Sequence, residues 1–201
     1  ENQPARLQLL SFAISKEDLD EVIALCAPAV EYIPDALEFY YYWGIAHSQK
    51  KEYDEALEVL KKGVRQVVPD SDKNMVSDFY SIMGDLYHLK DMNTEAYAAY
   101  DSAMVYNANN ISVLNNYAYY LSLEKENLDK AEEMSYRTVK AEPTNSTYLD
   151  TYAWILFEKG KYAEARIYID QAMQNGGEGS SVVVEHAGDI YSLNEIGRAS
   201  C

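Results

Sequence analysis

The sequence predicts an all-α fold, a solenoid in which antiparallel helix hairpins repeat along an axis. Apolar residues recur mainly at helical spacing, and the alternation that is typical of strands is rare. Glycine and proline, which interrupt regular structure, number only 9 and 5 in 201 residues. A segment of hairpin length also recurs along the chain, and self-similarity at a fixed period is the sequence signature of stacked repeats.

The recurring segment is clear at residues 151–165, "TYAWILFEKGKYAEA", where an apolar run passes into a charged stretch with alanines. A small register residue marks each copy, at spacings of 40, 34, 35 and 35 residues. The register residues are Gly44, Gly84, Ala118, Ala153 and Gly188. A second small residue follows twelve or thirteen positions later, and a third closes three of the four full units, Thr138 being the exception. These are Ala56, Ala96, Ala131 and Ala165, then Gly63, Ala103 and Ala172.

The pattern in each unit predicts two helices, an inner one around the register residue and an outer one around the second small residue. The first unit is degenerate, with its first helix at residues 4–14 and its second within residues 15–35, which end with Pro34 and Asp35. Pro69 and Pro143 close later units, and a polar insertion at 69–75 absorbs the long first spacing. We expect one solenoid domain over residues 1–201, with units at about 3–35, 36–70, 75–109, 110–144 and 145–179 and a partial unit at 180–194.

The small residues have a steric role. The first allows the two helices of a hairpin to cross closely, and the others admit bulky side chains of the neighbouring unit. One hairpin cannot bury its apolar face alone, so stacking is required, and this explains so apolar a segment in a chain of net charge −16. Large residues fill the remaining space, among them Tyr40, Trp43, Tyr80, Met83, Tyr87, Tyr117, Tyr152 and Leu156.

This pattern resembles the tetratricopeptide repeat (TPR) family, whose 34-residue unit has the same order of aromatic, Gly or Ala, Tyr, Ala, aromatic, Ala and Pro. The resemblance covers roughly residues 36–194. It implies a right-handed superhelix of about five units with an unpaired final helix, acting as a non-enzymatic scaffold for protein–protein contact. Residues 148–173 resemble TPR proteins of Bacteroidota, many of which are exported, and this favours the cell envelope over the cytoplasm.

In this family the first helices of successive units line a concave face that binds partners. Helical spacing from the register residue then selects the positions that face inward. The candidates for a peptide groove are Tyr41, Ile45, Ser81, Asp85, His88, Asn115, Tyr119, Asp150, Trp154, Phe157, Glu185 and Asp189. The charged residues on these faces are acids, also when Glu38, Asp78 and Glu158 are included, so the Lys and Arg that grip a C-terminal carboxylate are absent. We expect an acidic, aromatic-containing groove for a basic or mixed polypeptide segment.

Composition argues against several other classes. Acids outnumber bases 33 to 17, so nucleic acid would be repelled over most of the surface. No run of 18 apolar residues predicts a transmembrane segment. Cys26 and Cys201 cannot form a zinc site, and no Ser/His/Asp or Cys/His arrangement can be assembled, so we expect no metal, cofactor or catalytic residue. The acids near His88 and His186 are attributed to the acidic composition.

Three alternatives stay open. The chain could be the recognition segment of a larger enzyme such as a glycosyltransferase, or a cell-envelope lipoprotein that organises secretion or polysaccharide machinery. It could also form a homodimer through its C-terminal end, because the last unit lacks a second helix. Such an open end would expose Val183, Val184, Ile190 and Tyr191, unless a longer chain or a partner covers them.

Overall fold

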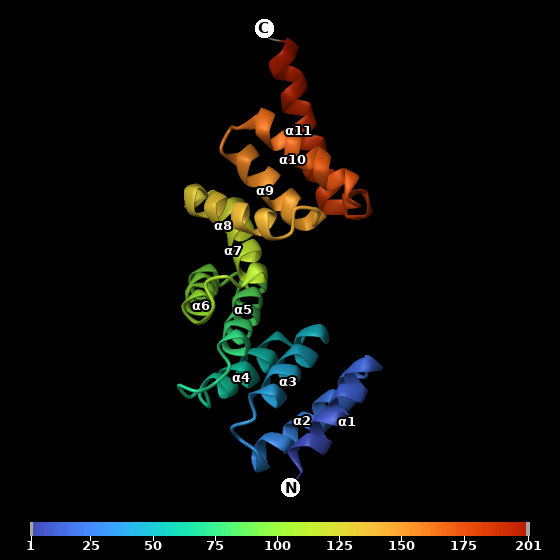
Figure 1. Cartoon of the computed structure of the whole chain (residues 1–201), viewed down its shortest axis with the longest axis vertical. Helices are drawn as coiled ribbons and strands as arrows, with labels where there is room; N and C mark the ends of the chain where they lie inside the picture. The colour runs from blue at the N-terminus through green and yellow to red at the C-terminus, as the bar shows by residue number, and fades with distance from the viewer. Residues whose placement is uncertain (1, 200–201) are drawn as a thin grey trace. The chain divides into compact units, whose positions relative to one another are not determined.

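The computed structural model describes residues 2–199, and side chains as far as residue 193. Over this range the chain is all-α, with eleven α-helices, one short 3-10 turn and no strand (Figure 1). The helices are α1 (Gln3–Ser15), α2 (Leu19–Tyr32), α3 (Leu37–Gln49), α4 (Tyr53–Val64), α5 (Lys73–Leu89), α6 (Asn93–Tyr106), α7 (Ile111–Leu123), α8 (Leu128–Ala141), α9 (Ser146–Glu158), α10 (Tyr162–Gln174) and α11 (Ser181–Ala199).

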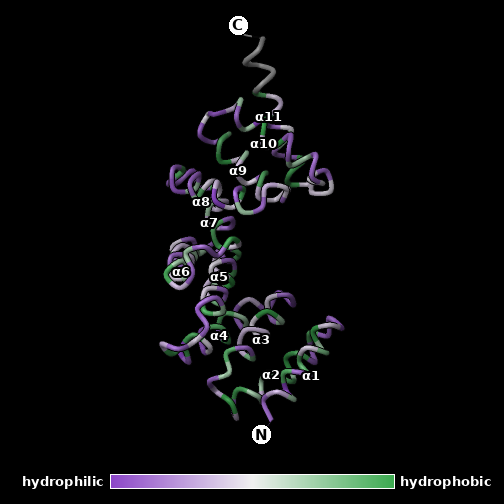
Figure 2. The backbone as a smooth tube through the Cα atoms, viewed as in Figure 1, coloured by the Kyte–Doolittle hydropathy of each residue, from purple (hydrophilic) through white to green (hydrophobic). Residues whose placement is uncertain are grey.

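Ten of these helices form five hairpins, and α11 follows as a single helix without a partner in the described part of the chain. The predicted fold class of repeated hairpins with an unpaired final helix is therefore confirmed. Hydrophobic and hydrophilic residues are interspersed along the helices (Figure 2). The glycine-rich stretch at 176–181 ends α10 and turns into α11 through the short 3-10 segment Gly177–Gly179, as expected for a helix stop.

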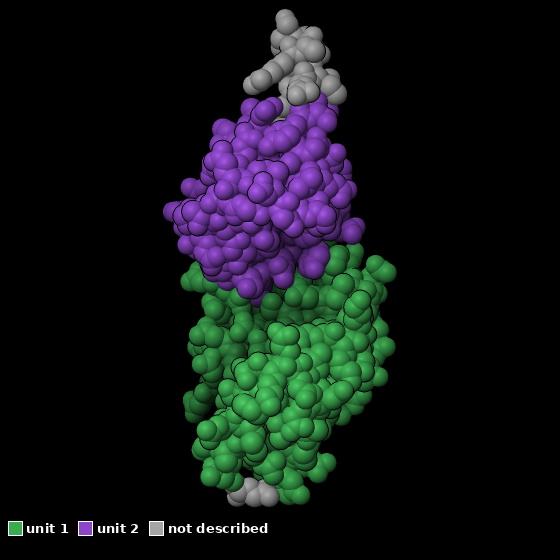
Figure 3. All heavy atoms as spheres, turned by 90° about the vertical axis from the view of Figure 1, so that its right-hand side faces the viewer, with its two compact units in different colours: residues 1–110 green, residues 111–201 purple. Residues whose placement is uncertain are grey.

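The chain divides into two compact units, Glu1–Asn110 and Ile111–Cys201 (Figure 3). Unit 1 holds α1 to α6, and its buried residues form clusters around Phe39, Leu60 and Phe79. Unit 2 holds α7 to α11, with a cluster around Leu149, Leu156 and the last helix. A single domain over residues 1–201 stays a prediction.

Each hairpin turns through a residue in the left-handed conformation. It lies two positions beyond the last residue of the first helix, and the next backbone amide donates to a carbonyl five positions earlier, as Glu52 does to His47 and Lys161 to Leu156, both at 2.9 Å. This is the Schellman arrangement, which usually employs glycine. Here four of the five are not glycine: the residues and their φ angles are Glu17 (56°), Lys51 (63°), Asp91 (58°), Lys125 (56°) and Gly160 (75°).

The predicted steric role of the register glycines is confirmed where a second helix is present. A Cβ at Gly44 would lie 2.6 Å from Leu60 of α4, and a Cβ at Gly84 would lie 2.6 Å from the ring of Tyr100 of α6. Around Gly188 of α11 nothing lies within 4 Å of such a Cβ. The crossing surface of α11 is therefore open.

The expected exposure of α11 is correct on one face and wrong on the other. Val183 and Ile190 are 4% and 0% exposed, because this face of α11 packs on α9 and α10 as an inner helix packs on the preceding hairpin. Tyr191 is half-buried and its hydroxyl donates to Asp170 at 2.7 Å. Val184, on the other face, is exposed.

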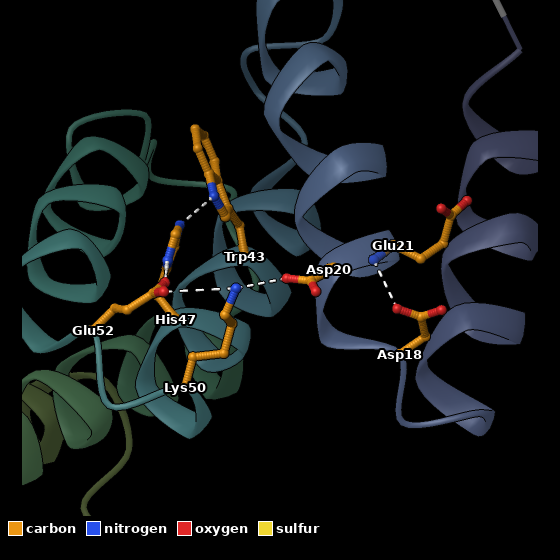
Figure 4. A network of polar contacts seen from close by, with 7 residues as sticks. All are labelled: Asp18, Asp20, Glu21, Trp43, His47, Lys50 and Glu52. Carbon is orange, nitrogen blue, oxygen red and sulfur yellow. Dashed lines mark hydrogen bonds and ion pairs between the residues drawn. The ribbon is translucent and has the colours of Figure 1, made fainter.

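Lysines at the ends of first helices connect successive hairpins within each unit. We call these contacts the junction ion pairs: Lys50–Asp20, Lys90–Asp54 and Lys159–Asp129. Figure 4 shows the first, in which the Nζ atom of Lys50 lies 2.6 Å from Asp20 and 3.6 Å from Glu52. The same network continues inward, since Trp43 Nε1 donates to His47 Nε2 at 2.8 Å and His47 Nδ1 lies 2.6 Å from Glu52.

Candidate functional site

First helices of unit 2 bring together several of the predicted groove residues. Tyr119 lies on α7, Asp150, Trp154 and Phe157 lie on α9, and His186 lies on α11. We call these five residues the aromatic–acidic cluster. Successive first helices adjoin in this unit, α7 with α9 and α9 with α11, so side chains at similar register positions meet.

A buried pair lies at the centre of the cluster. His186 Nδ1 lies 3.0 Å from both carboxylate oxygens of Asp150, and the side chains are 8% and 6% exposed. With a hydrogen on Nδ1, the imidazole donates to the carboxylate, which when ionised can only accept a hydrogen bond. The pair joins α11 to α9 and fixes the plane of the imidazole.

The fixed imidazole is one layer of an aromatic stack. The rings of His186 and Trp154 lie 4.1 Å apart at 15°, and the rings of Trp154 and Phe157 lie 5.0 Å apart at 20°. Tyr119 approaches the imidazole at 6.2 Å and 54°, and Tyr162 meets Phe157 edge-on at 5.5 Å. Trp154 is half-buried in this stack, and through His186 it packs on the neighbouring inner helix α11.

Carboxylates lie close to the stack and change its electrostatics. Burial raises the pKa of Tyr119 above its ordinary value of 10.0, and the nearby carboxylates of Asp150 and Glu185 raise it further. The Tyr119 hydroxyl therefore stays protonated and available as a hydrogen-bond donor over the physiological pH range. Glu185 and Asp189 are exposed on α11, the helix that carries His186, and Glu185 is one of the carboxylates that act on Tyr119.

Two polar atoms in this region are buried without a hydrogen-bond partner. They are the indole nitrogen Nε1 of Trp154 and the amide oxygen Oδ1 of Asn115 on α7, which is only 6% exposed. An unpaired buried polar group costs about 1–3 kcal/mol. Of the two, the indole nitrogen of Trp154 belongs to the aromatic–acidic cluster.

The predicted groove acids of unit 2 differ in whether their carboxylates can contact a partner. Asp150 is 4% exposed and engaged with His186, so it acts on a partner only through the electrostatic field and through the imidazole. Glu185 and Asp189 are exposed and can contact a partner directly. Charge reversal at Asp150 would bury an unpaired lysine, and it is unsuitable as a test of binding.

In unit 1, two candidates are engaged inside their own hairpin and two others are buried or half-buried. Ser81 is 7% exposed, and Asp85 accepts a hydrogen bond from the hydroxyl of Tyr100 on the partner helix α6. His88 Nδ1 lies 3.2 Å from Asn93, at the start of α6. Tyr41 is half-buried against Phe79, and burial followed by the Asp78 carboxylate raises its pKa.

Ile45 instead lines a pocket of about 540 Å³ in unit 1. The pocket opens between α1 and α3, and Val22 of α2 forms its floor because that residue is only 3% exposed. Its other residues are mainly apolar, with Glu17 and Gln49 as the polar ones: Ile14, Glu17, Leu19, Tyr42, Ala46 and Gln49. At this volume it is large enough to take an apolar side chain of a partner.

The polar insertion at 69–75 forms part of a second pocket, of about 570 Å³. Val68, Leu37 and Met75 give it apolar patches. The charged residues that line it are Asp35, Glu38, Asp70, Asp72 and Asp78, all acids. Two of them, Glu38 and Asp78, are acids that the sequence assigned to the inward faces.

Sequence reasoning missed the role of His186, whose neighbouring acids were attributed to composition. The sequence did contain a signal, because Asp150 and His186 are separated by 36 residues, one more than the repeat of 35. Groups one repeat apart on adjacent inner helices are neighbours, so the pairing was open to prediction from the register. Burial of both groups was not, because it depends on how the helices pack.

No group of three or more His, Cys, Asp or Glu side chains is placed to hold a metal ion in the part of the chain that the structure describes. Among the same residues, no helix combines the length and apolarity that crossing a membrane requires.

Comparison with known proteins agrees with this fold. No protein-family model matches the chain. A TPR repeat-containing protein of Pseudomonas aeruginosa is 24% identical over 176 residues, which are 85% of this chain but 28% of that protein. The chain therefore spans little more than a quarter of the length of this relative.

Solved structures give the same result at low sequence identity. A tetratricopeptide repeat protein from Parabacteroides merdae is 13% identical, with a TM-score of 0.72 over 98% of this chain and 75% of that one. YrrB, described as a TPR protein with an unusual peptide-binding site, is 17% identical, with a TM-score of 0.68 over 92% of this chain and 90% of that one. The chain has the fold of TPR proteins, and the resemblance to TPR proteins of Bacteroidota is confirmed at the level of fold.

Proposed function

We propose that the protein is a non-enzymatic scaffold that binds a basic or mixed polypeptide segment on the first helices of its repeats. The fold is one that supports protein–protein interaction scaffolds in general. The observation that carries the finer proposal is the aromatic–acidic cluster of unit 2, whose stacked rings include His186 of α11, the helix that also bears the exposed carboxylates of Glu185 and Asp189.

This combination favours a cationic side chain. Aromatic faces attract Lys and Arg at close range, and the nearby carboxylates add direct charge pairing and steer the approach. The half-buried Trp154 and Tyr119 supply rigid amphipathic area, the kind of surface on which binding energy concentrates. A peptide-binding site is also described for YrrB, a protein of similar fold.

Unit 1 supports the proposal in a different way. Its apolar pocket between α1 and α3 suits an apolar side chain of a bound segment, and its acidic pocket suits a basic one. We also propose self-association that involves the open face of α11, where Val184 and Gly188 are uncovered.

The test is affinity capture of partners from a lysate of the native organism with immobilised protein. The wild type is compared with the double variant Glu185→Lys/Asp189→Lys, whose positions are exposed and leave the buried pair intact. Binding of a basic segment should fall by about tenfold or more, because two attractive charges become repulsive. Captured proteins are then remeasured in pure form by titration.

The matched control is Glu126→Lys/Glu178→Lys, which changes net charge equally at exposed positions outside the aromatic–acidic cluster. This variant should bind as the wild type does. Equal loss in both double variants would mean that only net charge matters, and unchanged binding by the cluster variant would refute the proposed surface.

A further inference from the structure

The outer face of α11 repeats a buried surface but is uncovered. Leu114 and Leu149 lie four positions before the register residues of α7 and α9, and both are 0% exposed. Val184 holds the same position before Gly188 and is 46% exposed. The space over Gly188 is also empty, whereas Leu60 and Tyr100 fill it over Gly44 and Gly84. The open face of α11 therefore has room over Gly188 for a large side chain of another helix.

The first helix exposes a face of the complementary kind. Leu9 and Phe12 of α1 are 56% and 60% exposed. With Ala5 and Lys16 they follow helical spacing, so the four residues lie along one stripe of the helix.

The two faces also carry opposite charges. Lys16 is the charged residue of the α1 stripe, with its Nζ atom 4.1 Å from the centre of the Phe12 ring, and the segment from residue 2 to residue 16 contains no acid. Among the described side chains of α11, Glu185 and Asp189 are the carboxylates, and both are exposed. Contact between two α11 helices would place like charges against each other, whereas contact between α1 and α11 pairs opposite charges.

We infer that α1 of one copy docks on α11 of a second copy, with Phe12 or Leu9 entering the space over Gly188. Such a contact is heterologous, because each copy offers two different surfaces, and it therefore permits assemblies larger than a dimer. The apolar area on each side is a few side chains, so we expect association in the micromolar range. The contact shares the carboxylates of Glu185 and Asp189 with the proposed peptide surface, so the variants that test it are placed at other residues.

Sedimentation velocity over a range of protein concentrations tests the contact. The average mass of the wild type should rise with concentration beyond that of a dimer. Phe12→Gln and Gly188→Gln should each weaken association by about tenfold or more, the first by removing the large side chain and the second by filling the space. Both positions are exposed, so neither variant should lose helical circular dichroism or melt at a lower temperature than the wild type.

The matched control is Val105→Gln on α6, which removes an apolar side chain that is 83% exposed elsewhere in the chain. This variant should associate as the wild type does. Leu9→Gln and Val184→Gln provide a second pair of interface variants, so that the result does not depend on one substitution in each helix.

Mixing the variants separates this contact from a symmetric one. Phe12→Gln retains an intact α11 and Gly188→Gln an intact α1, so an equimolar mixture should form a one-to-one complex that stops at the dimer. A symmetric dimer through α11 would leave Phe12→Gln associating normally and would give no gain on mixing. Either that result or a wild type that stays monomeric at all concentrations would overturn the inference, and the latter would assign the face of α11 to a different partner.

Discussion

The Nδ1 atom of His186 lies 3.0 Å from both carboxylate oxygens of Asp150, and less than a tenth of the surface of either side chain is exposed. The contact connects α9 with α11, which has no second helix of its own in the described residues. A buried, directional contact is thus added to the apolar packing that holds the last helix. It also presents the imidazole flat against Trp154.

The His186–Asp150 pair should therefore contribute to the stability of unit 2. His186→Ala leaves a buried carboxylate without its donor, which should lower the free energy of unfolding by about 3 kcal/mol. Urea unfolding followed by Trp fluorescence measures this, in a Trp43→Phe background so that Trp154 is the reporter. The double variant His186→Ala/Asp150→Ala should lose less than the sum of the single variants. Strict additivity would show that the pair has no coupling energy.

The register glycines should respond to the same substitution with opposite signs. Gly84→Ala places a methyl group 2.6 Å from the Tyr100 ring and should destabilise the protein by about 1–3 kcal/mol. Gly188→Ala meets nothing within 4 Å and lies inside a helix, so it should stabilise by about 0.5–1 kcal/mol. Thermal unfolding at low protein concentration compares the two. Equal destabilisation would contradict the open face of α11.

Two hairpin turns provide another matched comparison. Lys51 has a φ of 63°, and Lys51→Gly should stabilise by about 0.5–1 kcal/mol because glycine adopts this conformation without Cβ strain. Gly160 has a φ of 75° and open space around it, so Gly160→Ala should destabilise by about 1 kcal/mol through the backbone alone. Denaturant midpoints at constant slope report both effects. A neutral result at Gly160 would mean that the turn rearranges.

Cys26 should be unreactive while the protein is folded. Burial raises the pKa of this thiol from 9.0 to about 12, so almost no thiolate forms at pH 8.5. In a Cys201→Ser background, iodoacetamide should modify Cys26 only after unfolding. The stabilisation linked to this shift is complete below pH 9 and is lost as the pH rises toward 12. Rapid modification of the native protein would show that α2 opens.

Periodicity made the fold predictable. The spacing of Gly44, Gly84, Ala118 and Ala153 defines the hairpins. Each close helix crossing requires a small residue, so small residues recur at the period of the repeat. The site was less accessible. Spacing placed Tyr119, Trp154 and Phe157 on adjacent inner helices, but it could not show that Asp150 is buried, since burial depends on contacts between helices far apart in the chain.

The same limit explains the errors at α11 and in unit 1. Val183 and Ile190 were expected to be exposed because a missing second helix was treated as baring the whole final helix, whereas the preceding hairpin covers one side. Asp85 was expected in the groove because it follows Gly84. However, the ring of Tyr100 packs over Gly84, and the Tyr100 hydroxyl donates a hydrogen bond to the Asp85 carboxylate. Such short-range competition between side chains leaves no periodic signal.

The junction ion pairs have a consequence for how the protein unfolds. Lys50–Asp20 and Lys90–Asp54 connect one hairpin to the next and contribute nothing within a hairpin. In a chain of stacked repeats, cooperativity depends on such nearest-neighbour coupling, whereas helix content depends on each hairpin. Salt screens these partly exposed pairs, so rising ionic strength should broaden the unfolding transition while the helices persist. The salt concentration would then influence how many hairpins unfold as one cooperative unit.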